Sequence, residues 1–185
     1  MIFCFSSLRK QRSRQATVQS LRFFLLICVG VFHSGALKAA DVSEAEFQAV
    51  RAILDVNGLT KKSVEGVSII EDGRIVGLYL QEGGIAKIPD EIGKLTALRL
   101  VHLYGDRSLD LPLLKEISPT IGNCTEIEEL LLNQNALTTL PAEIANLKKI
   151  TLLSIADNQI QSLPPAADAW AKKFDPSGLS NQTTK

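Results

Sequence analysis

The sequence of 185 residues is poor in the side chains that most often carry chemistry. Aromatic residues make up 5% of it, and it has two histidines, three cysteines, one tryptophan and one methionine. Only Cys124 lies beyond residue 40, so that part of the chain cannot form an internal disulfide. Stability must therefore come from packing, with leucine and isoleucine supplying most of an apolar content of 45%.

Catalytic motifs are missing as well. His102 is the single histidine beyond residue 40, and the chain has no H-E-x-x-H, no G-x-S-x-G, no P-loop and no paired cysteines. Acidic residues occur in neighbouring pairs, whose carboxylates face different ways: Glu71-Asp72, Asp90-Glu91 and Glu128-Glu129. The sequence therefore favours a protein that is not an enzyme and that uses no metal and no cofactor.

The formal net charge of zero hides an uneven distribution. The first 40 residues carry six basic and no acidic side chains, so the other 145 carry 20 − 6 = 14 basic and all 20 acidic ones, a net charge of −6. An acidic body without a basic stripe argues against nucleic acid as a partner.

An apolar run follows the basic start. The segment FFLLICVGVF, Phe23–Phe32, and the small residues after it have the layout of a secretory signal peptide. Such a run is too short to span a bilayer of ~30 Å as a helix. We therefore predict a signal peptide over residues 1–40, cleaved near 36–40, and an exported protein, periplasmic or extracellular, without stable membrane insertion. An uncleaved anchor or a buried helix is the alternative.

Residues 41–74 predict a helix followed by a hairpin. Ser43 and Glu46 form the S-x-x-E pattern of a capping box, and apolar residues then recur at helical spacing as far as an Asn-Gly pair. We expect the helix from about Glu44 to Val56. Asp72-Gly73 lies between two β-branched runs and predicts a tight type I′ turn.

The rest of the chain repeats one pattern. The units that begin at Ile127 and Ile150 share L-x-x-L-x-L-x-x-N-x-L-x-x-L-P, and two earlier units fit the same template. The L-x-L part predicts a short strand with its leucines on one face. The asparagine side chain can satisfy backbone groups at the bend that follows, and the segment after the proline returns along the outer side in helical or 3₁₀ turns. Stacked units then share one continuous core.

This pattern resembles the leucine-rich repeat family, in the 23-residue style that ends L-P-x-x-I-x-x-L. The resemblance implies an α/β fold, a leucine-rich repeat solenoid with short parallel strands on its concave side. The four repeats are 75–97, 98–126, 127–149 and 150–172. The helix and hairpin of residues 41–74 resemble the N-terminal cap of secreted plant-type repeat proteins, and the absence of the cysteines usual there suggests a bacterial member.

The C-terminal end departs from the repeat. The segment PPAADAWAKKF, Pro164–Phe174, predicts a short helical cap in which Trp170 seals the core. Residues 173–185 are polar, and we expect them to form a disordered tail.

The second unit departs from the template in two ways. Asp106 replaces its asparagine, as Gly83 does in the first unit. We therefore expect a weaker ladder of hydrogen bonds at the bends of these two units. The unit is also six residues longer than the third. Matching Leu111-Pro112 to the Leu-Pro pair of the other units places the extra residues within 113–120, where they would bulge on the outer side and leave the strand ladder intact.

Cys124 stands where the first and third units have leucine. We therefore expect a buried thiol that acts as a small apolar side chain rather than as a reactive group. A metal site at this thiol would need a second cysteine, and none follows residue 40.

Side chains between the buried strand leucines should point out of the concave sheet, with equivalent positions of neighbouring strands about 4.8 Å apart. Both tyrosines and the one histidine beyond residue 40 occupy such positions. Tyrosine is favoured at interfaces, and the resemblance implies that this face binds proteins. The candidate binding residues are Tyr79, Gln81, Leu100, His102, Tyr104, Glu129, Leu131 and Asn133.

Together these observations predict a non-catalytic protein–protein interaction module of an exported leucine-rich repeat protein, with a protein or peptide bound on the concave face. The alternative is a structural cell-envelope component that binds cell-wall polymer or a membrane partner. An enzyme is the third hypothesis, and the lack of catalytic residues argues against it.

Overall fold

The computed structural model describes residues 42–80 and 84–183, which belong to one compact unit, Ala39–Lys185. The predicted signal peptide, Gln81 and Gly83 lie outside the described residues. Within the described ranges, every helix is too short or too polar to cross a membrane.

The N-terminal helix has the predicted bounds, but its predicted cap is wrong. Helix α2 spans Glu44–Val56, and the side chain of Ser43 makes no capping hydrogen bond. The Glu46 carboxylate instead accepts a hydrogen bond from the Ile75 N–H at 2.8 Å and pairs with Arg74 at 2.6 Å. Because Glu46 is only 3% exposed, these tertiary partners stabilise its charge better than the local cap would.

The predicted hairpin is confirmed. Strands β1, Ser68–Glu71, and β2, Arg74–Tyr79, pair antiparallel around the Asp72-Gly73 turn. The φ angles of these two turn residues are 48° and 73°, the left-handed values that a type I′ turn requires. Strand β1 therefore covers the edge that β2 would otherwise leave unpaired.

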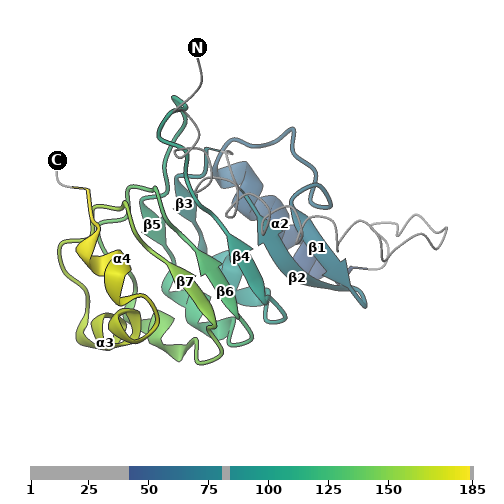
Figure 1. The fold of residues 1–185 in the computed structure, drawn as a ribbon. Coiled ribbons are helices and arrows are strands. Elements are labelled where there is room, and N and C mark those ends of the chain that lie inside the picture. The colour runs from purple at the N-terminus through teal and green to yellow at the C-terminus, as the bar shows by residue number, and fades with distance from the viewer. Residues whose placement is uncertain (1–41, 81–83, 184–185) are drawn as a thin grey trace, which may run out of the picture. The chain divides into compact units, whose positions relative to one another are not determined.

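Three further repeat strands extend this hairpin into one five-stranded sheet (Figure 1). After the antiparallel β1–β2 pair, neighbouring strands run parallel, in the order β1-β2-β4-β6-β7. The three further strands are β4 (Leu100–His102), β6 (Glu129–Leu131) and β7 (Leu152–Ser154). Their central residues continue the row of Leu78 and are buried, as the repeat pattern predicts.

A second side of each repeat closes the core. Short strands β3 (Lys87–Ile88) and β5 (Glu116–Ile117) pair in parallel, and 3₁₀ turns follow in three repeats at η2 (Asp90–Lys94), η3 (Pro119–Asn123) and η4 (Ala142–Asn146). The buried residues of all repeats and of α2 form a single apolar cluster, so the repeats share one core.

The extra residues of the second repeat do not lie where the sequence comparison placed them. Ile117, not Leu111, pairs with Ile88, and its exposure is 9% against 44% for Leu111. The insertion therefore falls between Leu103 and Leu114, where 114 − 103 = 11 positions replace the 137 − 132 = 5 of the third repeat. The local similarity of Leu111-Pro112 to the other Leu-Pro pairs was misleading, because burial and backbone pairing make Ile117 the equivalent residue. The inserted loop follows β4 at the end of the sheet.

The repeat asparagines have the predicted role. Asn135 accepts a hydrogen bond from the Leu114 N–H at 3.0 Å and donates to the Leu103 carbonyl at 2.7 Å. Asn158 makes the equivalent bonds one repeat later, at 3.1 and 2.9 Å. Both side chains are buried, so each satisfies backbone groups that water does not reach. We call this row of equivalent side-chain amide bonds the amide ladder.

In the first repeat a side chain from the N-terminal cap replaces backbone acceptors. Asn57, which follows α2, accepts hydrogen bonds from the Ala86 and Lys87 N–H groups at 2.8 and 3.0 Å. Asp106 does not join the ladder, because its carboxylate accepts from the Ser108 N–H at 2.8 Å inside the loop. Asn57 thus stands in for a preceding repeat, whose backbone carbonyl would serve Ala86 as the Ala86 carbonyl serves the Lys115 N–H.

The C-terminal cap contains the predicted helix, α3, Pro165–Phe174. Trp170 is buried and donates its indole N–H to the Leu147 carbonyl at 2.9 Å, which confirms that it closes the core.

The predicted disorder of residues 173–185 is wrong as far as residue 183, where the described chain ends. The described chain continues through helix α4, Pro176–Ser180, to residue 183. Gln182 accepts from the Ile160 N–H and donates to the Ile155 carbonyl, both at 3.0 Å, as a repeat asparagine would. Two polar side chains of this segment, Asp175 and Gln182, therefore bond to the last repeat.

Candidate binding surface

The sheet register brings most of the predicted binding residues together. One row contains Gly77, Leu100, Glu129 and Leu152, and the next contains Tyr79, His102, Leu131 and Ser154. The buried leucine row lies between them in sequence and points to the opposite side of the sheet. We call the sheet face the surface formed by Tyr79, Leu100, His102, Glu129, Leu131 and Leu152.

Two more predicted residues, Tyr104 and Asn133, follow β4 and β6 and are partly buried. Of the eight predicted residues, only Gln81 lies outside the described part of the chain. The sheet face therefore draws on four neighbouring strands, β2, β4, β6 and β7, and its geometry is set by backbone pairing.

Three side chains from consecutive strands contact one another at the centre of the sheet face. The rings of Tyr79 and His102 meet edge to face, with their centroids 4.7 Å apart. The Nε2 atom of His102 lies 3.2 Å from Oε2 of Glu129. Strands β2, β4 and β6 are thus linked on this face by polar and aromatic contacts as well as by their backbones.

Burial raises the pKa of the Tyr79 hydroxyl, and the negative charge of Glu129 raises it further. At neutral pH Tyr79 is therefore a neutral phenol that offers one hydrogen-bond donor to a ligand. The charge of Glu129 acts across the face as far as β2.

The surroundings of this centre are apolar. Leu100 and Leu131 are half-buried, and Leu152 on the last strand is 47% exposed. A Cβ atom on Gly77 would lie 3.1 Å from the side chain of Ile69, so Ile69 of β1 covers that position. Leu152 and Ile69 are not among the predicted binding residues. The repeat period alone would have indicated that Leu152 lies on this face. Only the register of the β1–β2 hairpin shows that Ile69 lies there too.

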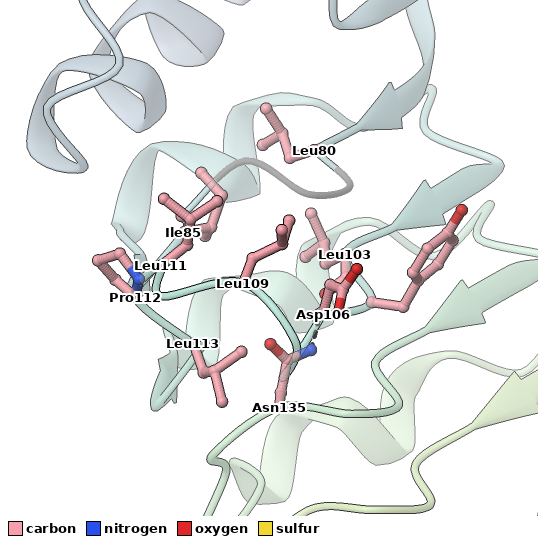
Figure 2. Close-up of a pocket in the computed structure, with 12 residues that line it drawn as sticks. Leu80, Ile85, Leu103, Asp106, Leu109, Leu111, Pro112, Leu113 and Asn135 are labelled. Atoms are coloured by element: carbon pink, nitrogen blue, oxygen red, sulfur yellow. Dashed lines mark hydrogen bonds between the residues drawn. The ribbon is translucent and has the colours of Figure 1, made fainter.

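The inserted loop forms a second apolar feature beside Tyr104. An open hollow lies between this loop and the ends of β2 and β4, and Figure 2 shows the side chains that line it. Its volume is about 270 Å³, open solvent at its mouth included. Leu103, Leu109 and Leu113 are among its lining residues, and Leu109 and Leu111 are both partly open to solvent. The hollow lies close to the sheet face because Tyr104 lines it and follows β4.

Chemically reactive groups do not gather on either surface. Among the described residues, no group of three or more His, Cys, Asp or Glu side chains could hold a metal ion. The thiol of Cys124 is buried and donates to the Ile92 carbonyl at 3.2 Å, and burial raises its pKa to about 12. The arrangement is suited to binding through shape, apolar contact and one carboxylate.

No protein-family model matches the sequence. Solved structures do resemble this one. The leucine-rich repeat ectodomain of the receptor kinase SOBIR1 from Arabidopsis thaliana matches with a TM-score of 0.53 and 19% identity, over 66% of this chain and 70% of that one. A plant ice-binding protein matches with a TM-score of 0.53 and 19% identity, over 70% of this chain and 46% of that one.

A leucine-rich repeat protein of Leptospira interrogans is 24% identical over 63% of this chain, with a TM-score of 0.44, and this chain spans 28% of its length. The two plant structures carry the comparison. The protein has the leucine-rich repeat fold, with a parallel sheet of short strands and flanking helices, as predicted.

Proposed function

We propose that the protein is a non-catalytic module that binds a protein or a peptide on the sheet face. The observation that carries this proposal is the continuity of the face across four strands. Tyr79, His102 and Leu131 lie side by side in one row, with Leu100 and Leu152 in the next. Apolar and aromatic side chains that are partly open to solvent and that surround a charged group are typical of interaction sites.

We further propose that the chain is exported and that its mature form begins after a signal peptide cleaved near residues 36–40. The basic start, the apolar run Phe23–Phe32 and the small residues after it support this proposal. The N-terminal sequence of the protein recovered from each cell fraction tests it. A start at residue 1 in the cytoplasmic fraction alone would contradict it.

A comparative pull-down tests the binding function. The tagged full-length protein and its Tyr79→Ala/Leu131→Ala variant are incubated with the native envelope fraction, and the retained proteins are quantified. The control variant is Lys94→Ala/Glu143→Ala, which changes exposed residues of η2 and η4. We expect specific proteins that the wild type and the control retain and that the sheet-face variant loses.

Equal recovery by all three proteins would contradict a partner on the sheet face. Retention by isolated cell wall, independent of Tyr79 and Leu131, would instead support a structural envelope component. Circular dichroism of each variant shows that the fold is intact before the comparison is made.

A further inference from the structure

We infer that the sheet face holds an arginine side chain of its partner, within an apolar peptide segment, and that Glu129 is the counter-ion of that arginine. This inference rests on the proposed function and names the chemistry of the partner. Four properties of the surface support it.

The first is the position of Glu129. It lies on β6 between two leucines of the same row, Leu100 on β4 and Leu152 on β7. Its side chain is 23% exposed, so the carboxylate is partly removed from water in the middle of an apolar surface. A charge in such a place is costly unless it has a partner, which makes it a strong site for a cation.

The second is the unused bonding capacity of this carboxylate. Its one hydrogen-bonded neighbour among the described residues is His102, which approaches Oε2. A carboxylate accepts several hydrogen bonds, and Oε1 receives none from the described part of the chain. A guanidinium group donates two parallel hydrogen bonds and matches this geometry, whereas an ammonium group acts as a point charge.

The third is the absence of a lysine or arginine counter-ion among the described residues. No lysine or arginine in the described ranges lies within ion-pair distance of Glu129. Arg99, next to Leu100, pairs with Glu71, and Lys149, ahead of β7, pairs with Glu126. The negative charge of Glu129 is therefore available to a ligand, and its action on Tyr79 shows that it reaches across the face.

The fourth is the character of the neighbouring side chains. The rings of Tyr79 and His102 offer aromatic surface beside the carboxylate, on which a guanidinium group can stack. Leu100 and Leu152 can contact the methylene groups of an arginine and the apolar residues that flank it. The net charge of −6 over residues 41–185 also attracts a basic partner and suppresses acidic ones.

A displayed library of random peptides tests the inference. The library is selected against the immobilised full-length protein, and the recovered sequences are compared with those selected against Tyr79→Ala/Leu131→Ala. We expect peptides that depend on the sheet face and that are enriched in arginine beside aliphatic residues.

A recovered peptide is then synthesised with arginine and with citrulline, which keeps the shape and removes the charge. We expect citrulline and the Glu129→Gln variant each to weaken binding by about tenfold or more, and the two changes together to cost little more than one. Glu126→Gln is the matched control, because it makes the same charge change at the pair with Lys149, and it should alter the affinity less than about twofold.

The outcomes separate the two proposals. Peptides that depend on Tyr79 and Leu131 but lack arginine, or carry lysine instead, would overturn the arginine site and leave the proposed function standing. An equal response to Glu129→Gln and Glu126→Gln would also overturn it. If no selected peptide depends on the sheet face, the proposed function fails together with the inference.

Discussion

The carboxylate of Asp175 accepts a hydrogen bond from the backbone N–H of Ile155 at 3.0 Å. At the equivalent positions of inner repeats, the N–H groups of Leu103 and Leu132 donate to carbonyls of the next strand. A side chain thus replaces the backbone of a repeat that does not follow. The segment 175–183 therefore belongs to the C-terminal cap together with α3, since Gln182 continues the amide ladder in the same way.

This finding predicts a stability effect far from the sheet face. Asp175→Ala leaves the Ile155 N–H without its acceptor, and we expect the free energy of unfolding to fall by about 1–3 kcal/mol. Asp175→Asn keeps an acceptor oxygen and should cost less. Urea denaturation measures both. Asp168→Ala, which removes an exposed ion pair with Lys172, is the control and should cost less than about 1 kcal/mol.

The amide ladder can be tested at Asn135. Replacing it with alanine removes the partners of the Leu114 N–H and the Leu103 carbonyl in the core. We expect a loss of about 2 kcal/mol or more, because buried backbone groups become unsatisfied. Asp106→Ala removes only the turn hydrogen bond with Ser108 and should lower the free energy of unfolding by less. Thermal denaturation that ranks the two variants in the reverse order would contradict the ladder.

A deletion tests the position of the insertion. Removing residues 107–112 restores the spacing of the third repeat, and we expect a folded protein with native circular dichroism. Removing 113–118 instead deletes Leu114 and Ile117, which are buried, and we expect the fold to be lost. A folded second deletion together with an unfolded first one would favour the position that the sequence comparison indicates.

Cys124 should be inert in the folded protein. Its pKa of about 12 keeps it a thiol at neutral pH, and the core excludes reagents. We expect labelling by a disulfide reagent to follow global unfolding in urea, measured in the Cys4→Ser/Cys28→Ser variant. Since the folded pKa is the higher one, the thiol's contribution to stability is complete below the ordinary thiol pKa. It declines as the pH rises from there towards 12, and Cys124→Ala should lack this decline.

Tyrosine titration tests the electrostatics of the sheet face. Burial is the larger cause of the raised pKa of Tyr79 and the charge of Glu129 is the smaller. Glu129→Gln should therefore lower the pKa only part of the way to its ordinary value. Ultraviolet difference spectra of wild type and variant, each compared with its Tyr79→Phe counterpart, measure this shift. An unchanged pKa in the variant would show that the Glu129 charge does not act on Tyr79.

The sequence alone was sufficient to predict the core residues and the strand pairing of the repeats. The recurring leucines determine which side chains enter the core, and strands at the same repeat position pair in register. Tyr79, His102 and Leu131 could therefore be placed in one row before any coordinates were known. Helix α2 and the hairpin turn at Asp72-Gly73 were equally accessible, because both depend on local preferences.

Only the tertiary structure decided how the repeats end and where the irregular segment lies. Glu46 bonds to Ile75 rather than to its own helix, and Asn57 and Gln182 bond to backbone groups of the first and last repeats from outside the repeats. These bonds join residues 22 to 29 positions apart, and no local pattern indicates them. A buried backbone group needs a hydrogen-bond partner, but the partner can be any group that tertiary packing places within reach. Its identity therefore depends on the folded structure and not on the neighbouring sequence.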